Sequence, residues 1–320
     1  LINKQSFEVT TLRRDIDTDG RHATVQFTDN WVEDANRRDF TINTLLADDK
    51  GRIYDPTGQG LSDLRAGQVL FVGDPLARIR EDYLRILRFF RFYAYYGKDI
   101  DERALQACIA EAGSLKNLSR ERITQEFFKI LAADTADNVV QIMYQQGIVS
   151  DIIPIANPEG RLNGLIQLQK QYDAVSLMAR LYVLFDRGGL RFKQSTKYLV
   201  YSNKEQKLYA TLCNAMDFLY DEVNFPIKYM LYTYGRKVTL QAYFLFSATH
   251  SNQQAEGIVS RIREDNIPKF PLGGTQLKSL GMLQGPEMGS LLKQIESWWI
   301  EHDFKPDEQA CLDYAQRLIG

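Results

Sequence analysis

The segment that most constrains the fold of this chain is residues 79–93, which combines apolar residues at helical spacing with an acid and three arginines that follow it at intervals of three. The apolar positions recur as on one face of a helix that packs on a core: Ile79, Tyr83, Ile86, Phe90 and Tyr93. The charged positions follow at intervals of three: Asp82, Arg85, Arg88 and Arg91. Residues three apart are neighbours on a helix surface, so the spacing predicts one amphipathic helix whose charged side chains converge on a ligand.

The pair Asp82 and Arg85 indicates which ligand edge would fit. An aspartate only accepts hydrogen bonds and an arginine only donates them. The complementary edge has a donor beside an acceptor, as in cytosine (N4 and N3) and adenine (N6 and N1), whereas uracil and guanine carry a carbonyl in place of the amino group. A wrong base leaves buried polar groups unpaired at roughly 1–3 kcal/mol each. The residues alone leave a second interpretation open, a solvated helix face with weak salt bridges.

Residues upstream of this segment extend the interpretation toward a nucleotide. Arg37 and Arg38 suit a triphosphate, and the adjacent carboxylate of Asp39 can accept a ribose hydroxyl. With these residues the chain resembles the class II tRNA nucleotidyltransferases, the CCA-adding enzymes, which share a superfamily with bacterial poly(A) polymerases. The matching segments keep the family's order and spacing over residues 7 to 131: residues 7–13, 19–23, 37–41, 55–64, 81–85 and 118–123.

The resemblance implies an α+β fold in three parts. Residues 1–70 would form the C-terminal part of a nucleotidyltransferase head of the DNA-polymerase-β type. Residues 71–150 would form a helical neck with the base-recognition and RNA-binding region, and 151–320 a helical, tRNA-binding body and tail.

Roles for single residues also follow from the resemblance. Arg38 would contact the nucleotide's phosphates and Asp39 its ribose, while Asp82 and Arg85 would read the base. The remaining positions would be further nucleotide contacts (Arg88 and Arg91), the hinge between head and neck (Asp55, Gly60 and Asp63), and the flexible loop linked to the switch from C to A addition (Arg21 and His22).

The metal-binding residues of the family have no match in this sequence. Family members carry a Gly-Gly loop and then an Asp-x-Asp pair before the segment that corresponds to residues 7–13. Such a pair holds two Mg²⁺ ions about 3.5–4 Å apart for attack on an α-phosphate. Asp15 and Asp17 have the spacing of this pair, but they align with the family's segment after the strand that carries it. They are therefore interpreted as a solvated turn. Glu8 matches the family's third active-site carboxylate, with an exposed strand residue as the alternative.

This difference leads to an expectation about activity. The chain from Leu1 to Gly320 should bind nucleotide weakly and transfer it poorly. A version extended at the N-terminus by the Gly-Gly loop and the Asp-x-Asp strand should be active.

Length and composition restrict the class of protein in general terms. A length of 320 residues predicts two or more domains. No apolar run approaches the ~20 residues that cross a bilayer, and no secretory signal leads the chain, so we expect a cytoplasmic protein with no membrane association and no stable protein partner. Cys108, Cys213 and Cys311 fit neither a zinc site nor a disulfide framework and are expected to be buried thiols. The net charge is −2, and basic residues concentrate at 78–91, 116–122 and 187–204.

Local patterns predict β-strands early in the chain and helices afterwards. The expected strands are 7–12, 23–28 and 52–55. The expected helices are 35–46, 119–131, 135–146, 172–185, 206–220, 238–246, 253–266, 276–280 and 291–299. Ser119 is the expected cap of one helix and Gly147 the end of another. Two prolines and two glycines near 151–162 are typical of a linker.

The resemblance implies a reaction: template-independent addition of CMP and AMP, from CTP and ATP with Mg²⁺, to the 3′ end of a tRNA held by its acceptor stem and elbow. Two alternatives remain open. One is a bacterial-type poly(A) polymerase, which the absence of a basic C-terminal tail disfavours. The other is a non-catalytic RNA-binding remnant, because the metal-binding Asp-x-Asp is absent.

Overall fold

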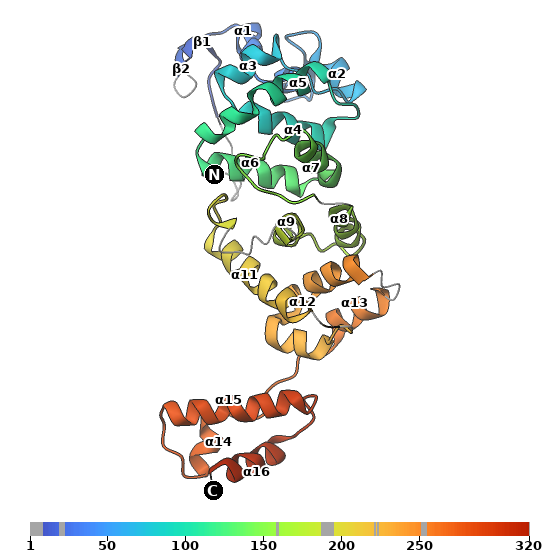
Figure 1. The fold of residues 1–320 in the computed structure, drawn as a ribbon. Coiled ribbons are helices and arrows are strands. Elements are labelled where there is room, and N and C mark those ends of the chain that lie inside the picture. The colour runs from blue at the N-terminus through green and yellow to red at the C-terminus, as the bar shows by residue number, and fades with distance from the viewer. Residues whose placement is uncertain are drawn as a thin grey trace. The chain divides into compact units, whose positions relative to one another are not determined.

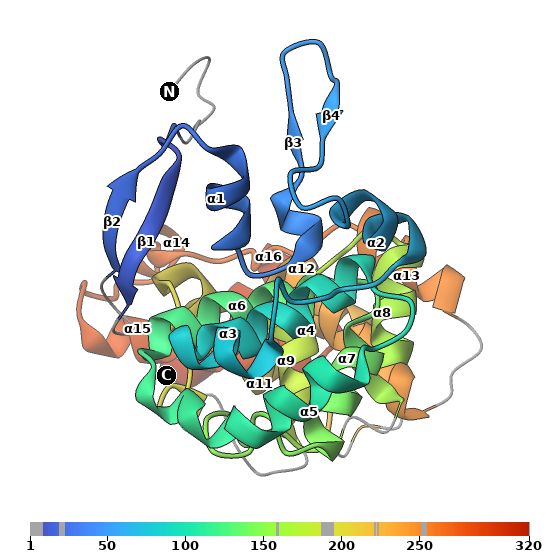
Figure 2. The ribbon, with the colours of Figure 1, turned by 90° about the horizontal axis from the view of Figure 1, so that it is seen from above.

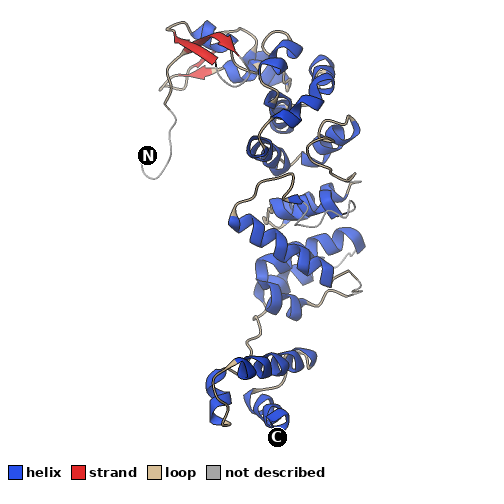
Figure 3. Ribbon diagram, turned by 60° about the vertical axis from the view of Figure 1, so that its left-hand side comes forward, coloured by secondary structure: helices blue, strands red, loops and turns tan. Residues whose placement is uncertain are grey.

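The structure, a computed structural model, describes residues 9–18, 23–157, 160–186, 195–220, 222, 224–250 and 255–319. These residues belong to two compact units, 1–206 and 207–320. The described strands lie within the first 54 residues, and the regular elements beyond them are helices (Figure 3). The α+β prediction, with a small sheet region followed by helices, is therefore confirmed. The boundaries between head, neck, body and tail stay a prediction, because the two units form a coarser division.

An antiparallel hairpin opens the first unit (Figure 2). Its strands are β1 (Arg13–Thr18) and β2 (Ala23–Phe27), with a register shift between Asp15 and Asp17. The prediction that Asp15 and Asp17 form a turn is wrong, since both lie in β1. The strand expected over 7–12 is not formed in its described residues, 9–12. Strand pairing depends on a partner from elsewhere in the chain, which local patterns do not identify.

The helix expected over 35–46 is replaced by short elements. These are α1 (Trp31–Asn36), the 3₁₀ turn η1 (Thr41–Thr44) and a second strand pair, β3 (Leu46–Ala47) with β4 (Ile53–Tyr54). The buried Phe40 lies between α1 and η1 and separates them, because its backbone is extended and forms a bridge with Phe71. Its neighbours bond to the same segment, with N–H donated to C=O from Thr41 to Leu70 and from Val72 to Asp39. Tertiary pairing thus overrides local helix propensity.

The regular elements in the remaining described residues of the first unit are helices (Figure 1). Its elements are α2 (Gly60–Ala66), α3 (Pro75–Glu81), α4 (Leu84–Tyr96), α5 (Glu102–Glu111), η2 (Ala112–Asn117), α6 (Arg120–Ala132), α7 (Ala136–Gln145), α8 (Arg161–Gln171) and α9 (Leu177–Asp186). Helix α4 packs against α3, α6 and α7. The apolar face of α4 is completely buried at Ile86, Phe89 and Phe90, as is Phe127 of α6. The apolar stripe of the sequence therefore forms the centre of this core.

Two predicted helix ends are confirmed. The Ser119 hydroxyl accepts from the Arg122 backbone N–H and caps α6. Gly147 has a φ of +67°, a left-handed conformation that favours glycine, and α7 ends just before it. The expected linker has no helix in its described residues before α8 (151–157 and 160), but Ile152, Ile153 and Ile155 are buried, so this part of it is packed rather than free.

The second unit is built from the helices that follow. The helices from residue 203 onward are α11 (Asn203–Phe218), α12 (Ile227–His250), α13 (Ala255–Glu264), α14 (Gly274–Ser279), α15 (Pro286–Glu301) and α16 (Glu308–Ile319). Gly235 interrupts α12 with a φ of +74°. Trp299 is buried and contacts Tyr232 and Phe270. The unit therefore has a core of its own.

Other features of the described chain bear on the remaining predictions. Cys108 and Cys311 are buried free thiols, as expected, and Cys213 is half-buried. Burial raises the pKa of the Cys108 thiol. No helix in the described ranges is long and apolar enough to cross a membrane.

Candidate nucleotide-binding site

The helix expected over 79–93 is broken at its first charged residue. Helix α3 ends at Glu81, Asp82 is extended (φ −155°, ψ 107°), and α4 begins at Leu84. The break has a local cause, because the Asp82 carboxylate accepts the Leu84 backbone N–H (Oδ1 to N 3.1 Å) and so satisfies one of the free donors at the start of α4. The prediction of one continuous helix is therefore wrong. Asp82 stands at the entrance of α4 instead of on the same helical face as Arg85.

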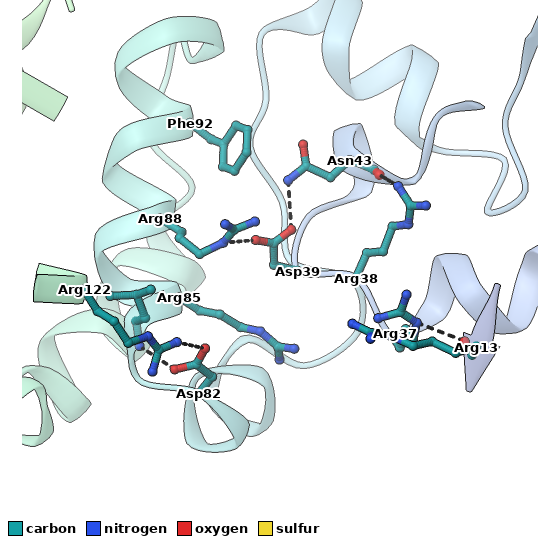
Figure 4. Close-up of a pocket in the computed structure, with 11 residues that line it drawn as sticks. Arg13, Arg37, Arg38, Asp39, Asn43, Asp82, Arg85, Arg88, Phe92 and Arg122 are labelled. Carbon is teal, nitrogen blue, oxygen red and sulfur yellow. Dashed lines mark hydrogen bonds and ion pairs between the residues drawn. The ribbon is translucent and has the colours of Figure 1, made fainter. Parts of the chain in front are cut away.

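A cavity of about 690 Å³ opens beside this break (Figure 4). Its volume falls in the range of small-molecule sites. The lining residues come from β1, from the segment after α1, from α4 and its entrance, and from α6: Arg13, Arg37, Arg38, Asp39, Asn43, Asp82, Leu84, Arg85, Arg88, Phe92 and Arg122. Six are arginines and two are aspartates. Such a surplus of cationic donors in a concave site is suited to a polyanion.

Asp34, which sequence reasoning missed, organises the first arginines. Its side chain is only 4% exposed and pairs with Arg37 (Nη2 to Oδ1 2.7 Å) and Arg38 (Nη2 to Oδ2 2.9 Å). Burial by itself would raise the pKa of the Asp34 carboxyl, but the hydrogen bonds from both arginines and from the Arg13 backbone N–H hold that pKa below its ordinary value. The spacing of Asp34 from Arg37 (i,i+3) and from Arg38 (i,i+4) is the sequence signal that could have identified it. Asp34 thus holds both guanidinium groups beside the cavity.

Asp39 lines the cavity and is almost completely buried. Its Oδ2 pairs with Arg88 Nε of α4, and its Oδ1 accepts from Asn43 Nδ2 (2.8 Å) and from the Phe40 N–H (3.0 Å). Burial by itself would raise the pKa of this carboxyl, but Arg88 and the two hydrogen bonds at Oδ1 together hold it below its ordinary value. Asp39 is therefore ionised at neutral pH, and it links the segment after α1 to α4.

The side chains of Asp82 and Arg85 do not bond to each other, although the Arg85 backbone N–H donates to the Asp82 carbonyl (3.0 Å). The Asp82 Oδ2 accepts from Arg122 Nη2 (2.7 Å), while Arg85 Nη1 donates to Glu81 and to the Arg78 carbonyl (2.8 Å). Both side chains line the cavity, where Figure 4 shows Arg85 reaching between Asp82 and Arg37. Arg122 is a second residue that sequence reasoning missed, although it lies in one of the matched segments.

Arg91 does not line the cavity. It forms an ion pair with the buried Glu126 of α6 (Nε to Oε2 3.2 Å), and its guanidinium lies over the Phe92 ring, 4.3 Å from the centroid. Arg91 thus connects α4 to α6 and contacts a lining residue, Phe92, without lining the cavity itself.

The three expected hinge residues support α2 and also lie outside the lining. Asp55 accepts the Gly58 and Leu61 backbone N–H groups (3.0 Å each), so it tethers the start of α2. A Cβ at Gly60 would stand 2.5 Å from the Thr41 carbonyl oxygen, so only glycine fits this approach to η1. Asp63 is buried. These contacts hold α2 against the segment that carries Asp39.

Several expected positions fall outside the described residues: Glu8, Arg21 and His22. Within the described ranges, no group of three or more His, Cys, Asp or Glu side chains could hold a metal ion. Asp34 and Asp39 are both occupied by arginines. The described residues therefore do not form the metal platform that the family resemblance implies.

Two family models match parts of the chain. Residues 1–70 match the family described as "Poly A polymerase head domain", and residues 98–159 match "Probable RNA and SrmB- binding site of polymerase A".

Curated relatives match nearly the whole chain. The mitochondrial CCA tRNA nucleotidyltransferase 1 of Mus musculus is 32% identical over 337 residues, which cover 99% of this chain and 74% of that protein. The CCA-adding enzyme of Streptococcus gordonii is 28% identical and covers 99% of this chain and 80% of the relative.

Solved structures share the fold. The Bacillus stearothermophilus CCA-adding enzyme in complex with CTP has a TM-score of 0.78 at 21% identity, covering 96% of this chain and 78% of the other. The Thermotoga maritima CCA-adding enzyme complexed with tRNA has a TM-score of 0.61 at 20% identity, covering 91% of this chain and 74% of the other. By the extent of these matches, the chain belongs to the CCA tRNA nucleotidyltransferase family, the CCA-adding enzymes of the poly(A) polymerase superfamily.

Proposed function

We propose that this protein binds CTP and ATP in the arginine-lined cavity and adds CMP and AMP to the 3′ end of tRNA, with release of pyrophosphate. The observation that carries the proposal is the placement of Asp82 and Arg85 in one cavity with Arg37 and Arg38. A triphosphate would lie against Arg37 and Arg38, and the base would lie at Asp82 and Arg85. Relatives named CCA-adding enzymes, one of them solved with CTP, support this assignment.

The proposed base selection depends on the hydrogen-bonding capacity that the side chains of Asp82 and Arg85 retain. Each oxygen of Asp82 keeps a lone pair after its bonds to Leu84 and Arg122, so the carboxylate can accept an exocyclic amino group. In the described part of the chain, no hydrogen bond uses Nε or Nη2 of Arg85, which leaves donors for the adjacent ring nitrogen. With uracil or guanine both contacts fail, at roughly 2–6 kcal/mol, or on the order of 30-fold to 10⁴-fold in affinity.

Asp39 and Arg88 serve the same site in this proposal. The Asp39 Oδ2 keeps one lone pair beyond its bond to Arg88 and would accept a ribose hydroxyl. Arg91 faces Glu126 and would support α4 instead of contacting the nucleotide. Asp55, Gly60 and Asp63 would form the hinge between the head (1–70) and the neck (71–150). Residues 151–320 would bind tRNA as body and tail.

Mg²⁺ is part of the proposal as the family's metal. It would supply charge neutralisation at the phosphates and activation of the attacking hydroxyl. The proposed compartment is the cytoplasm, although relatives include mitochondrial enzymes.

The first experiment measures affinity without chemistry. Dissociation constants of CTP, ATP, UTP and GTP for the 320-residue chain should separate into a tight pair (CTP and ATP) and a weak pair. Arg85→Met should abolish the separation. Arg80→Met is the matched control, because Arg80 pairs with Glu111 at the surface (2.7 Å) and does not line the cavity. Equal affinities for all four nucleotides would refute the base-reading assignment.

The second experiment identifies the product. The protein as its gene encodes it is incubated with tRNA lacking CCA, labelled CTP and ATP, and Mg²⁺, and the products are sized. Three added nucleotides establish CCA addition. A long A tail establishes the poly(A) polymerase alternative, which the head-domain match also admits. Bound tRNA without any addition establishes the RNA-binding remnant.

A further inference from the structure

Arg78 of α3 is bonded to the segment that carries the phosphate-site arginines. Its side chain is 14% exposed and does not line the cavity. Its Nε donates to the Val72 carbonyl (2.9 Å), and its Nη2 donates to the carbonyls of Asn36 and Arg38 (3.2 Å to Arg38). One guanidinium thus joins both ends of the turn that presents Arg37 and Arg38.

The same residue also holds the base-reading arginine. Arg78 Nη1 donates to both carboxylate oxygens of Glu81 (3.0 Å each). Arg85 pairs with the same carboxylate through Nη1, and that Nη1 donates to the Arg78 backbone carbonyl (2.8 Å). Glu81 therefore lies between two guanidinium groups, and Arg85 is oriented by Arg78 both directly and through Glu81.

We infer that Arg78 is a positioning residue that couples the triphosphate end of the site to its base-reading end. The inference rests on the proposed function and names a specificity determinant for it. A triphosphate that orders Arg37 and Arg38 would thereby also restrict Arg85. The donors that Arg85 offers to the base would then keep one direction, which makes a mismatched base costly.

The geometry requires an arginine at this position. A guanidinium presents five N–H donors in a planar fork, and Arg78 uses three of its nitrogens in three directions. A lysine carries the same charge on one nitrogen and cannot reach these acceptors together. Arg78→Lys therefore keeps the charge and removes the coupling.

The test compares the ratio of the UTP and CTP dissociation constants in four proteins: wild type, Arg78→Lys, Glu81→Gln and Arg180→Lys. Arg180 is the matched control, because it is a buried arginine that donates to the Leu131 and Ala133 carbonyls (2.8 Å each) away from the cavity. We expect the ratio to fall about tenfold in Arg78→Lys and in Glu81→Gln, the loss of about one well-oriented charged hydrogen bond. It should keep its wild-type value in Arg180→Lys, whatever that variant loses in melting temperature.

Each outcome of this test either supports or overturns the inference about Arg78. Wild-type ratios in folded Arg78→Lys and Glu81→Gln overturn the inference and leave the proposed function standing. An equal fall in Arg180→Lys also overturns it, because the effect would then be a general loss of structure. A wild-type ratio near one overturns the proposed function and the inference with it. If Arg78→Lys does not fold, the folded Glu81→Gln variant decides alone, since Glu81 is partly exposed.

Discussion

Removal of Arg122 should weaken base discrimination roughly fivefold and cost the fold at most about 1 kcal/mol. In Arg122→Ala the Asp82 carboxylate keeps its bond to the Leu84 N–H and loses the 2.7 Å contact at Oδ2. The two side chains are 40% and 28% exposed, so the ion pair is worth at most about 1 kcal/mol of stability. The carboxylate would then rotate, and the hydrogen bond to a cytosine amino group would lose a similar amount. A change of about 1 kcal/mol is roughly fivefold in affinity.

The assay is the ratio of UTP to CTP dissociation constants, because loss of the Arg122 charge weakens both triphosphates alike and cancels in the ratio. Arg122→Lys restores the charge on a single donor nitrogen and should recover part of the ratio. Arg120→Ala is the matched control, since Arg120 starts the same helix, donates to the Thr196 and Lys197 carbonyls, and does not line the cavity. The reasoning is refuted if folded Arg122→Ala keeps the wild-type ratio within twofold, or if Arg120→Ala lowers it equally.

Four further outcomes are expected. Arg88→Met leaves the buried Asp39 carboxylate unpaired and should lower the free energy of unfolding by about 1–3 kcal/mol in urea titrations; an unchanged midpoint would contradict this. Because the native pKa of Asp39 lies below its ordinary value, its ionised form stabilises the fold above about pH 4 and that contribution is lost as the pH falls further, so the stability difference between wild type and Asp39→Asn should shrink in acid. Gly60→Ala places a Cβ against the Thr41 carbonyl and should cost about 1–3 kcal/mol, read from thermal melts. Cys108 should resist alkylation in the native protein and react once it is unfolded, because burial raises its pKa; rapid native modification would be inconsistent with its packing.

Much of the site was predictable because its residues are marked by local patterns. The alternation of charged and apolar positions in 79–93 identified the core helix α4 and singled out Asp82, Arg85 and Arg88. All three line the cavity. Helix caps were equally readable, since the Ser119 hydroxyl and the left-handed Gly147 act within their own turns of the chain. These patterns involve residues a few positions apart. Their predictions therefore hold unless a contact with a residue distant in sequence favours another local structure.

The prediction for Arg91 failed because the partners of Arg88 and Arg91 are distant in sequence. Arg91 has the same spacing as Arg88, yet Arg88 meets Asp39, 49 residues away, and Arg91 meets Glu126 on α6. Spacing on one helix does not distinguish these faces. Periodicity also could not reveal the break at Asp82, where a side-chain cap at Leu84 competes with the helix itself.

The sequence by itself determined the family, the helical character after the first 54 residues, and the identity of the chemical groups, because these depend on residue type and short-range order. The tertiary structure decided which groups meet. Arg122 reaches Asp82 from 40 residues away, and Arg78 reaches the Asn36 and Arg38 carbonyls from a similar distance. Contacts of this kind form only when helices pack, since the energy that aligns them comes from burial of apolar faces rather than from any local pattern.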